Sequence, residues 1–500
     1  MIIEKSNSAA SITIAEPVSL RPGETWGIVL LLLAFVACLN VGSLGALRLA
    51  LGLYAGVLLI IGLRDLRYLM LILIGLEPIR PTILSFGTLL GFQMTFNRII
   101  VPIAVVCYLL NRSKFSYRVD RKEPLLFILA GLSALSLLTD LLGDGTFLAG
   151  AQRTFSESVE VLLFAYICYR VFKSSELSTV VASFSIGGVL LCLCIFWEHF
   201  WNTNLLFRFP VPEDLYGLLV NANLTLDRAG TLRVRGPFQN SVYLSAFLPL
   251  VLFAAIYLLV AERRRLLGGT LLVMTVLSAT FSISRTAIFA LAICGVPALL
   301  YQARRMGIGR IIGYASTALV ILLLLYAIFP TDLQRAADLT LNLNDQSLGG
   351  TSTQDRMDLI TFGVPFVLGL NPFGVGVDRA ADISLLLGPD IANFFVGYSI
   401  ARGVIWVGAF CCMLIYLMWR LWHEKDAVSR MLFWLLLSIT ATYFSYAEYW
   451  ISFPMLLVFV LVHATAGPNP VESQLAMKKL VLAPQAGGTP NRIGEELCES

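Results

Sequence analysis

A single arginine, Arg285, interrupts a long apolar run between Arg265 and Arg304. The run of residues 266–303 is too long for one membrane span and suits two spans of about 18 residues each. Basic residues flank the run on both sides, which indicates two cytoplasmic flanks and an outer turn at SISRTA (282–287). A lone guanidinium at the mouth of such a hairpin indicates a functional site, and its charge points to an anion.

Further arginines lie in segments that we place on the outer side of the membrane. The planar guanidinium donates two parallel hydrogen bonds to adjacent oxygens, which suits a lipid diphosphate at the outer leaflet. The alternative roles of such an arginine are snorkelling to the interface and pairing with a loop aspartate. The outer arginines are Arg228, Arg233, Arg235, Arg285, Arg335, Arg356, Arg379 and Arg402.

The outer segments also contain acids that could orient an arginine or take a proton from an incoming hydroxyl group. We prefer Glu448, in the turn SYAEYW (445–450), although capping of a helix also explains this residue. Asp355 directly precedes Arg356 and is predicted to orient that arginine. The outer acids are Glu198, Asp355, Asp358, Asp378, Asp390 and Glu448.

Motifs for soluble catalytic chemistry are missing from the sequence. There is no HExxH pair, no CxxC pair, no phosphate-binding P-loop and no Rossmann fingerprint. His199, in FWEHFW (196–201), is the only histidine in an outer segment, and its aromatic neighbours favour a structural role. The sequence therefore predicts no metal, no nucleotide cofactor and no nucleic-acid partner, and it leaves a lipid-linked molecule as the donor.

The composition fits a membrane protein. Of the 500 residues, 57% are hydrophobic and 14% are charged, and the mean hydropathy is +0.80. A soluble domain cannot cover this much apolar surface. The expected fold class is an all-α polytopic membrane protein with about 12–14 transmembrane helices.

Hydropathy delimits roughly fourteen candidate spans, and Pro78 and Pro81 make a broken or re-entrant third span an alternative. Basic connections alternate with the spans, and every lysine lies in a connection or tail that we place inside. Both termini are therefore predicted to be cytoplasmic. The candidate spans are 26–46, 48–63, 68–84, 98–110, 124–142, 156–172, 178–199, 238–260, 267–283, 285–303, 311–329, 393–420, 431–447 and 449–465.

Three parts follow from this topology. Residues 1–25 form a cytoplasmic tail, residues 26–466 form the transmembrane domain, and residues 467–500 form a disordered, Pro/Gly-rich cytoplasmic tail. The transmembrane domain contains two large periplasmic loops, at about 201–236 and about 330–392. A loop as long as the second is typical of a functional element such as a lid over a site.

Three short motifs resemble the O-antigen ligase and Wzy-type polysaccharide polymerase family. RVRGPFQNSVYLSAFLPLVL (233–252) resembles its Arg–Gly entry to a span, and SISRTA resembles its Ser–Arg turn. STQDRMDLITFGVPFVLGLNPFGVGVD (352–378) resembles its arginine, helix and NPxxGxG motif in the large periplasmic loop. The matched region covers about residues 225–420, and the first 200 residues are similar in topology alone.

The resemblance implies a GT-C-like fold and a metal-independent glycosyltransferase of the bacterial inner membrane, with its active site facing the periplasm. The implied donor is an oligosaccharide linked to undecaprenyl diphosphate, and the implied acceptor is also lipid-linked. A flippase and a chain-length regulator of the same pathway are the implied partners. By the same resemblance, Arg235, Arg285 and Arg356 contact the diphosphate and the substrate.

Two sets of site residues follow. The predicted catalytic residues are Arg285, Arg235, Arg356 and Glu448, and the predicted substrate-binding residues are Arg233, Arg402, Asn393 and Asp355. Ligases of the family carry a histidine–asparagine pair at the entry to the span after the large loop. The corresponding segment DIANFFVGYSIARG (390–403) keeps Asn393 but contains no histidine, which favours the polymerase branch.

The leading hypothesis is a polysaccharide polymerase. An O-antigen or glycan ligase is the alternative among enzymes, and a lipid-linked oligosaccharide flippase or another transporter is the alternative from a different class. A flippase should carry charges in the middle of several spans. Here the unusual charges are concentrated in the outer segments, beside two large loops.

The predicted topology can be tested with reporter fusions. Fusions near residues 220 and 345 should report a periplasmic location, and fusions near residues 118 and 264 a cytoplasmic one, because the basic connections stay inside. A cytoplasmic signal at residue 345 would contradict both the orientation and the outer site.

Overall fold

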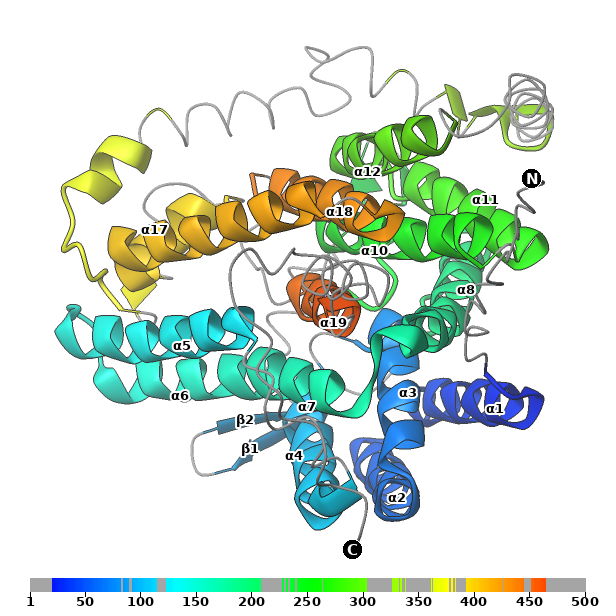
Figure 1. The fold of residues 1–500 in the computed structure, drawn as a ribbon, viewed down its shortest axis with the longest axis horizontal. Coiled ribbons are helices and arrows are strands. Elements are labelled where there is room, and N and C mark those ends of the chain that lie inside the picture. The colour runs from blue at the N-terminus through cyan, green and yellow to red at the C-terminus, as the bar shows by residue number, and fades with distance from the viewer. Residues whose placement is uncertain are drawn as a thin grey trace, which may run out of the picture.

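The computed structural model describes residues 20–81, 84–89, 92–114, 123–206, 208, 227–228, 231–232, 234–238, 241–262, 264–303, 326–331, 333–334, 338, 361, 363–376, 379–380, 383, 393–424, 426–444 and 451–464. This part of the chain is predominantly helical, which confirms the helical class expected from the sequence (Figure 1). It also contains two short antiparallel hairpins that the all-α expectation did not include. They are β1 (Ser85–Leu89) with β2 (Phe92–Thr95), and β3 (Asp227–Arg228) with β4 (Thr231–Leu232).

The helices follow the apolar runs of the sequence. The longer ones are α1 (Pro22–Leu39), α2 (Leu44–Arg64), α4 (Phe96–Leu110), α5 (Pro124–Leu142), α8 (Leu177–Trp201), α10 (Ser241–Val260), α11 (Arg265–Phe281), α12 (Arg285–Ala303), α17 (Phe394–His423) and α18 (Ala427–Thr442). The shorter ones are α3 (Leu66–Leu76), η1 (Glu77–Ile79), α6 (Phe147–Glu157), the π-helical segment η3 (Ser158–Leu163), α7 (Phe164–Val171), η4 (Ser174–Glu176) and α19 (Phe453–Ala464).

Short polar side chains fix where several helices begin. The first N–H groups of a helix have no acceptor within the helix, so a side-chain oxygen at the N-cap position satisfies one of them. Ser43, Asp65, Thr95 and Asp426 do this for α2, α3, α4 and α18. Asn393 does it twice, because its Oδ1 accepts from the N–H groups of Phe395 and Val396 at the start of α17.

Six of the helices within the described part are long enough and apolar enough to cross a membrane, by length and composition. They are α1, α2, α5, the helical stretch Ser174–Trp201, α10 and α17. On α1 and α2 large apolar side chains point away from the protein, with Trp26, Leu49 and Leu53 each about two-thirds exposed. Such faces require apolar surroundings, which supports a membrane protein.

The predicted spans agree with the helices in most places and differ in two. The third span is broken, since α3 ends at Leu76 and continues into η1 and the β1–β2 hairpin. Pro78 and Pro81 have no N–H for a continued helix, which accounts for the break. The span predicted at 156–172 is the second half of a longer rod, formed by α6, η3 and α7 in sequence. Most of the predicted span 311–329 lies outside the described residues.

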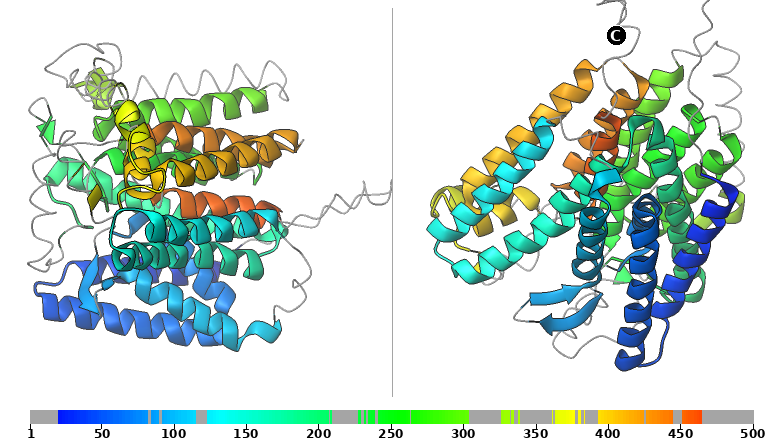
Figure 2. Two further views of the ribbon diagram at one scale, coloured as in Figure 1. Left: turned by 90° about the vertical axis from the view of Figure 1, so that its left-hand side faces the viewer. Right: turned by 60° about the horizontal axis from the view of Figure 1, so that its bottom comes forward.

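The helices lie side by side, and α10 and α19 occupy the interior (Figures 1 and 2). Every residue of α19 from Phe453 to Val462 is buried, and so is nearly all of α10. Both helices are apolar on every side, which is typical of a helix enclosed by others. These two helices therefore form the centre of the hydrophobic core.

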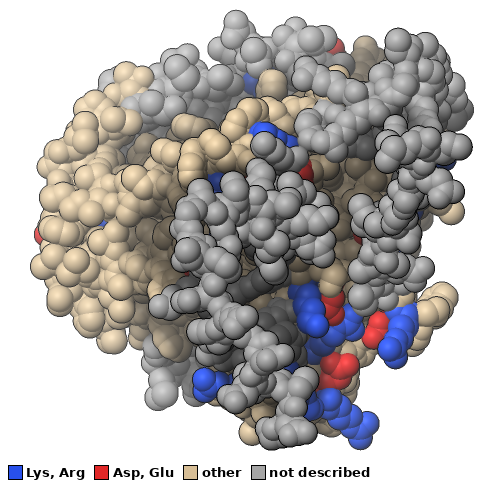
Figure 3. Space-filling view, viewed as in Figure 1, with Lys and Arg blue, Asp and Glu red and all other residues tan. Residues whose placement is uncertain are grey.

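Contacts between sequence-distant residues define one end of the bundle, which we call the Arg67 end. Arg67 forms ion pairs with Glu24 of α1 at 3.5 Å and with Glu176 of η4 at 2.7 Å. Arg420, near the end of α17, pairs with Glu123, which directly precedes α5. Charged side chains gather near α1–α3 on the face in view, which is otherwise largely uncharged where it is described (Figure 3).

The opposite end, which we call the Arg235 end, is joined mainly by main-chain groups. The side-chain amide of Asn40 donates to the main-chain carbonyl of Leu205 at 3.0 Å. The main-chain N–H of Phe394 donates to the carbonyl of Tyr443 at 2.9 Å. Helices α1 and α8 both run from the Arg67 end to the Arg235 end, because the contacts of Glu24 and Glu176 lie at their starts and that of Asn40 with Leu205 lies beyond their ends. The sequence predicts that the Arg67 end is cytoplasmic and the Arg235 end periplasmic.

Helix α17 is broken near the Arg235 end. Gly403 has a φ of 83°, and the carbonyls of Ile400 and Ala401 accept hydrogen bonds from Val375 and Gly376 instead of from their own helix. Gly374, with a φ of 87°, lies directly against Gly403, so that a Cβ on either glycine would meet backbone atoms of the other segment. The Gly-rich segment after Asn371 therefore fills the break in α17.

This close approach predicts that Gly403→Ala is strongly destabilising. The substitution places a Cβ against the carbonyl of Pro372 and forces a left-handed conformation on alanine, at a cost of about 3 kcal/mol. Gly408→Ala on the same helix is the matched control, because a Cβ there meets nothing within 4 Å. Thermal unfolding in detergent measures both, and equal melting temperatures for the two variants would contradict the packing described here.

Candidate functional site

The main chain at Arg235 is held by the end of α8. Glu198, in the last turn of α8, accepts a hydrogen bond from the N–H of Arg235 at 3.2 Å and another from the N–H of Gly236 at 2.9 Å. Asn204 donates its amide to the carbonyl of Gly236 at 2.7 Å. Gly236 has a φ of 58°, a conformation that glycine adopts at little cost. The three contacts fix a tight turn immediately before α10.

The Arg235 side chain is buried at this turn, with 6% of its surface exposed. Burial lowers the pKa of its guanidinium, and the negative charge of Glu198 opposes this shift. Arginine is the most basic of the side chains, so it remains protonated in this environment. The turn therefore holds a fixed positive charge where the chain enters α10.

The turn between α11 and α12 is the second feature of this end. Ile283 has a φ of 47°, which is strained for a β-branched residue. Ser282 secures the turn by donating its hydroxyl to the carbonyl of Ala279 at 2.7 Å. Arg285 is the first residue of α12 and is 9% exposed. Backbone strain of this kind is concentrated at functional sites, so the turn is a candidate for one.

An aromatic contact links the two features. The ring of His199, next to Glu198 on α8, stacks on Phe281 at the end of α11, with 3.9 Å between ring centroids and 7° between planes. Phe281 is four residues from Arg285. Arg235 and Arg285 therefore lie at the same end of the bundle, as the sequence predicted. His199 packs in an aromatic cluster, in agreement with the structural role expected for it.

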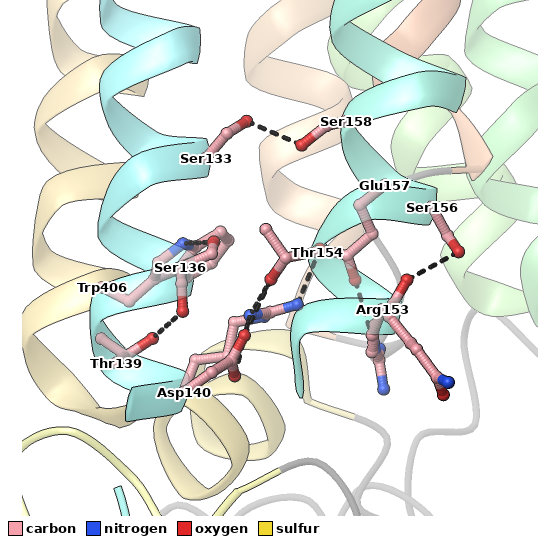
Figure 4. Close-up of polar contacts among 12 residues, drawn as sticks. Ser133, Ser136, Thr139, Asp140, Arg153, Thr154, Ser156, Glu157, Ser158 and Trp406 are labelled. Atoms are coloured by element: carbon pink, nitrogen blue, oxygen red, sulfur yellow. Dashed lines mark hydrogen bonds and ion pairs between the residues drawn. The ribbon is translucent and has the colours of Figure 1, made fainter. Parts of the chain in front are cut away.

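Arg402 lies at the centre of a buried polar network between α5, α6 and α17. Figure 4 shows Asp140, Thr154 and Glu157, which contribute to this network from α5 and α6. One terminal nitrogen contacts both carboxylate oxygens of Asp140 at 3.2 and 3.3 Å and the hydroxyl of Thr154 at 2.8 Å. The other contacts Glu157 at 3.2 Å. Arg402 is fully buried, and Asp140 is 5% exposed. Two acids and one hydroxyl therefore hold a guanidinium that water does not reach.

The network continues through Glu157 towards the surface. Arg153 donates to Glu157 at 2.9 Å and to the hydroxyl of Tyr398 at 3.1 Å. The indole of Trp406 donates to the hydroxyl of Ser136 at 2.6 Å, which joins α17 to α5 a turn further on. These contacts tie both halves of the broken α17 to the α5–α6 pair.

The π-helical segment η3 follows Glu157 directly and connects this network to a second one. Glu160 accepts hydrogen bonds from Arg98 at 3.2 Å and from the hydroxyl of Thr95 at 3.3 Å, both at the start of α4. Arg80 pairs with Glu77 at 3.0 Å at the end of the neighbouring α3. Single π turns occur frequently at functional sites, because the wider turn re-aims side chains.

A small cavity, partly open, lies beside the network between α5, η3, α17 and α19. Both polar and apolar groups line it. The polar ones are Ser133, Ser136, Thr154, Glu157, Ser158 and the indole of Trp406, and the apolar ones are Leu129, Leu132, Val161, Leu162, Phe410 and Phe453. Glu157 is therefore the acid of this network that borders open space.

Of the eight predicted site residues, four lie in the described part of the chain. Arg235 and Arg285 are brought to one end of the bundle. Arg402 is engaged by protein acids, and Asn393 caps α17 and is 3% exposed. The four that lie outside the described residues are Arg233, Asp355, Arg356 and Glu448.

The sequence analysis missed Asp140, Arg153, Glu157 and Glu160 as site residues. Asp140 is the only acid of the apolar helix α5, and Glu157 and Glu160 lie at the beginning of a predicted span. An ionisable residue within a span is itself a signal of a partner or a function. That signal was available for these residues, but Arg402, the common partner of Asp140 and Glu157, lies more than 240 positions away in the sequence.

One group of potential metal ligands occurs among the described residues, at the Arg67 end. Atoms of Glu424, Asp426 and His463 lie within 4.8 Å of one another. The hydroxyl of Ser429 contacts all three, at 2.5, 2.5 and 2.7 Å. Partial burial acts to raise the pKa of Asp426, but hydrogen bonds with His463 and Ser429 outweigh it and hold that pKa well below its usual range. The group closes the junction of α17, α18 and α19.

No protein-family model, no curated protein and no solved structure matches the chain. The class defined by the structure is a helical membrane protein, with two buried arginines at one end and a buried charge network between α5, α6 and α17.

The Arg402 network predicts a large stability difference between two arginine substitutions. Arg402→Gln leaves Asp140 buried without its cation, at a cost of about 3–5 kcal/mol. Arg67→Gln is the control, since Arg67 is one-quarter exposed and its ion pairs contribute about 1 kcal/mol or less. Denaturant or thermal unfolding in detergent gives the comparison, and similar losses in both variants would show that the network does not hold the bundle together.

Proposed function

We propose that this protein is a polysaccharide polymerase, a glycosyltransferase of the inner membrane that uses a glycan linked to a lipid diphosphate. The observation that carries the proposal is the burial of Arg235 and Arg285 at one end of a predominantly apolar bundle. Each guanidinium can donate paired hydrogen bonds to phosphate oxygens, so two at one end suit a ligand with two phosphates. The motifs around both residues resemble those of the polymerase family.

The position of Arg285 favours an anion. It is the first residue of α12, where the aligned peptide dipoles already place a partial positive charge. A phosphate at the start of a helix of this length gains from both the guanidinium and the dipole.

The proposed reaction needs neither metal nor nucleotide. The oxygen of an acceptor hydroxyl forms a bond to the anomeric carbon of the donor sugar, and the bond from that carbon to the diphosphate oxygen breaks. The electron pair leaves on the diphosphate, where Arg235 and Arg285 stabilise the negative charge. The hydroxyl proton passes to an acid on the same side or to solvent. Glu448 is the acid that the sequence favours.

The other predicted residues take supporting roles in this proposal. Arg233, Asp355 and Arg356 belong to the large outer loops and would complete the substrate contacts. Arg402 and Asn393 act through the shape of α17, because their side chains are engaged within the protein. The GT-C-like architecture and the periplasmic orientation of the Arg235 end are part of the same proposal.

A deletion strain analysed for lipid-linked glycan tests the proposal against its alternatives. A polymerase defect leaves single repeat units on the lipid carrier at the outer face. A ligase defect instead leaves long chains on the carrier, and a flippase defect leaves units on the inner face. Either of these two outcomes would overturn the polymerase assignment.

Substitution of Arg285 gives the residue-level prediction. Arg285→Ala should reduce polymer formation at least about a hundredfold at normal protein levels, because one donor to a developing anion contributes about 3–4 kcal/mol. Arg285→Lys should recover little, because the bidentate geometry is lost. Arg264→Ala, at the opposite end of the same helix hairpin, is the control and should be fully active. Full activity of Arg285→Ala would remove this residue from the mechanism.

A further inference from the structure

Glu198 has the chemistry of a catalytic acid but the contacts of a supporting residue. Each of its two carboxylate oxygens accepts one main-chain N–H, from Arg235 and from Gly236. The residue is 3% exposed. Consecutive N–H groups of a tight turn form a concave anion-binding site, and here the carboxylate occupies it. Both oxygens are therefore directed at the protein main chain.

We propose that Glu198 is the positioning residue of the lipid-diphosphate site, which fixes the Arg235 guanidinium by holding its main chain. This inference rests on the function proposed above. An arginine side chain is long and flexible, so it presents its two donors in one orientation only where its main chain is fixed. Asn204 provides the second support, because it binds the carbonyl of the same turn.

The contacts require a carboxylate and not merely a side chain of its size. A glutamine has one acceptor oxygen and one NH₂ donor, so Glu198→Gln leaves one of the two N–H groups facing another donor. The volume at the site is unchanged by this substitution. Its effect therefore separates the hydrogen bonds from packing. Asn204→Asp is the companion variant, since it keeps an oxygen for the N–H of Leu206 and removes the donor to Gly236.

The first experiment measures glycan transfer by the full-length protein in lipid vesicles. Glu198→Gln should lower kcat about tenfold to a hundredfold with a smaller change in KM, because the misplaced guanidinium acts in the transition state. The shape of the pH–rate profile should not change. In the Arg235→Ala background, Glu198→Gln should cause no further loss. Glu262→Gln, at the other end of α10, should be fully active.

Two outcomes of this experiment would overturn the inference. Loss of one limb of the pH–rate profile in Glu198→Gln would make Glu198 a proton acceptor. Independent, multiplicative losses from Glu198→Gln and Arg235→Ala would show that Glu198 does not act through Arg235.

A second experiment does not depend on catalytic activity. The purified protein is treated with the arginine reagent phenylglyoxal, and modification of Arg235 is followed by peptide mass spectrometry. Both Glu198→Gln and Asn204→Asp should raise the rate at which phenylglyoxal modifies Arg235 at least about fivefold. The reason is that a turn without these hydrogen bonds exposes its side chains to the reagent more often. Unchanged rates would overturn the positioning role. If the wild-type protein transferred no glycan, the proposed function would fail, and this measurement would still decide how Arg235 is held.

Discussion

Arg402 must be paired where it lies, and the arrangement of the helices around it follows from that requirement. Transferring a guanidinium from water into the protein interior costs several kcal/mol of free energy, unless acids and hydrogen-bond acceptors surround it there. Asp140, Thr154 and Glu157 provide those groups from two other helices. Helices α5, α6 and α17 can therefore pack in only one register, because a shift of either partner would leave a buried charge unpaired.

The break in α17 lies directly beside this buried ion-pair network. Arg402 directly precedes Gly403, where the helix opens and the segment after Asn371 takes over the hydrogen bonds of the freed carbonyls. A helix within an apolar layer tolerates such a break only if other groups satisfy its main chain. The segment 371–376 is in this way anchored close to the charge network.

Arg402 on the one hand, and Arg235 and Arg285 on the other, therefore have different physical roles. Arg402 is neutralised by acids of the protein and stabilises a unique packing. Arg235 and Arg285 lie at turns where helices begin, one beside a carboxylate that holds its main chain and one at the positive end of a helix dipole. In the proposed polymerase, Arg402 keeps the bundle rigid, and Arg235 and Arg285 bind the phosphates of the donor. Rigid support of this kind is what a site for an extended, flexible substrate needs.

The sequence by itself determined the helices, because length and apolar composition are local properties. The span predicted at 124–142 is α5, and the hairpin on either side of Arg285 is α11 and α12. Arg235 and Arg285 could also be predicted as site residues from the sequence, because a charge at the edge of an apolar run is recognisable without knowledge of the fold. It did not predict the bulge of η3 or the break at Gly403, which depend on neighbouring segments. Only the tertiary structure decided the partners of Arg402 and Glu198, because ion pairs and main-chain contacts across 37 to 262 positions depend on how the helices pack.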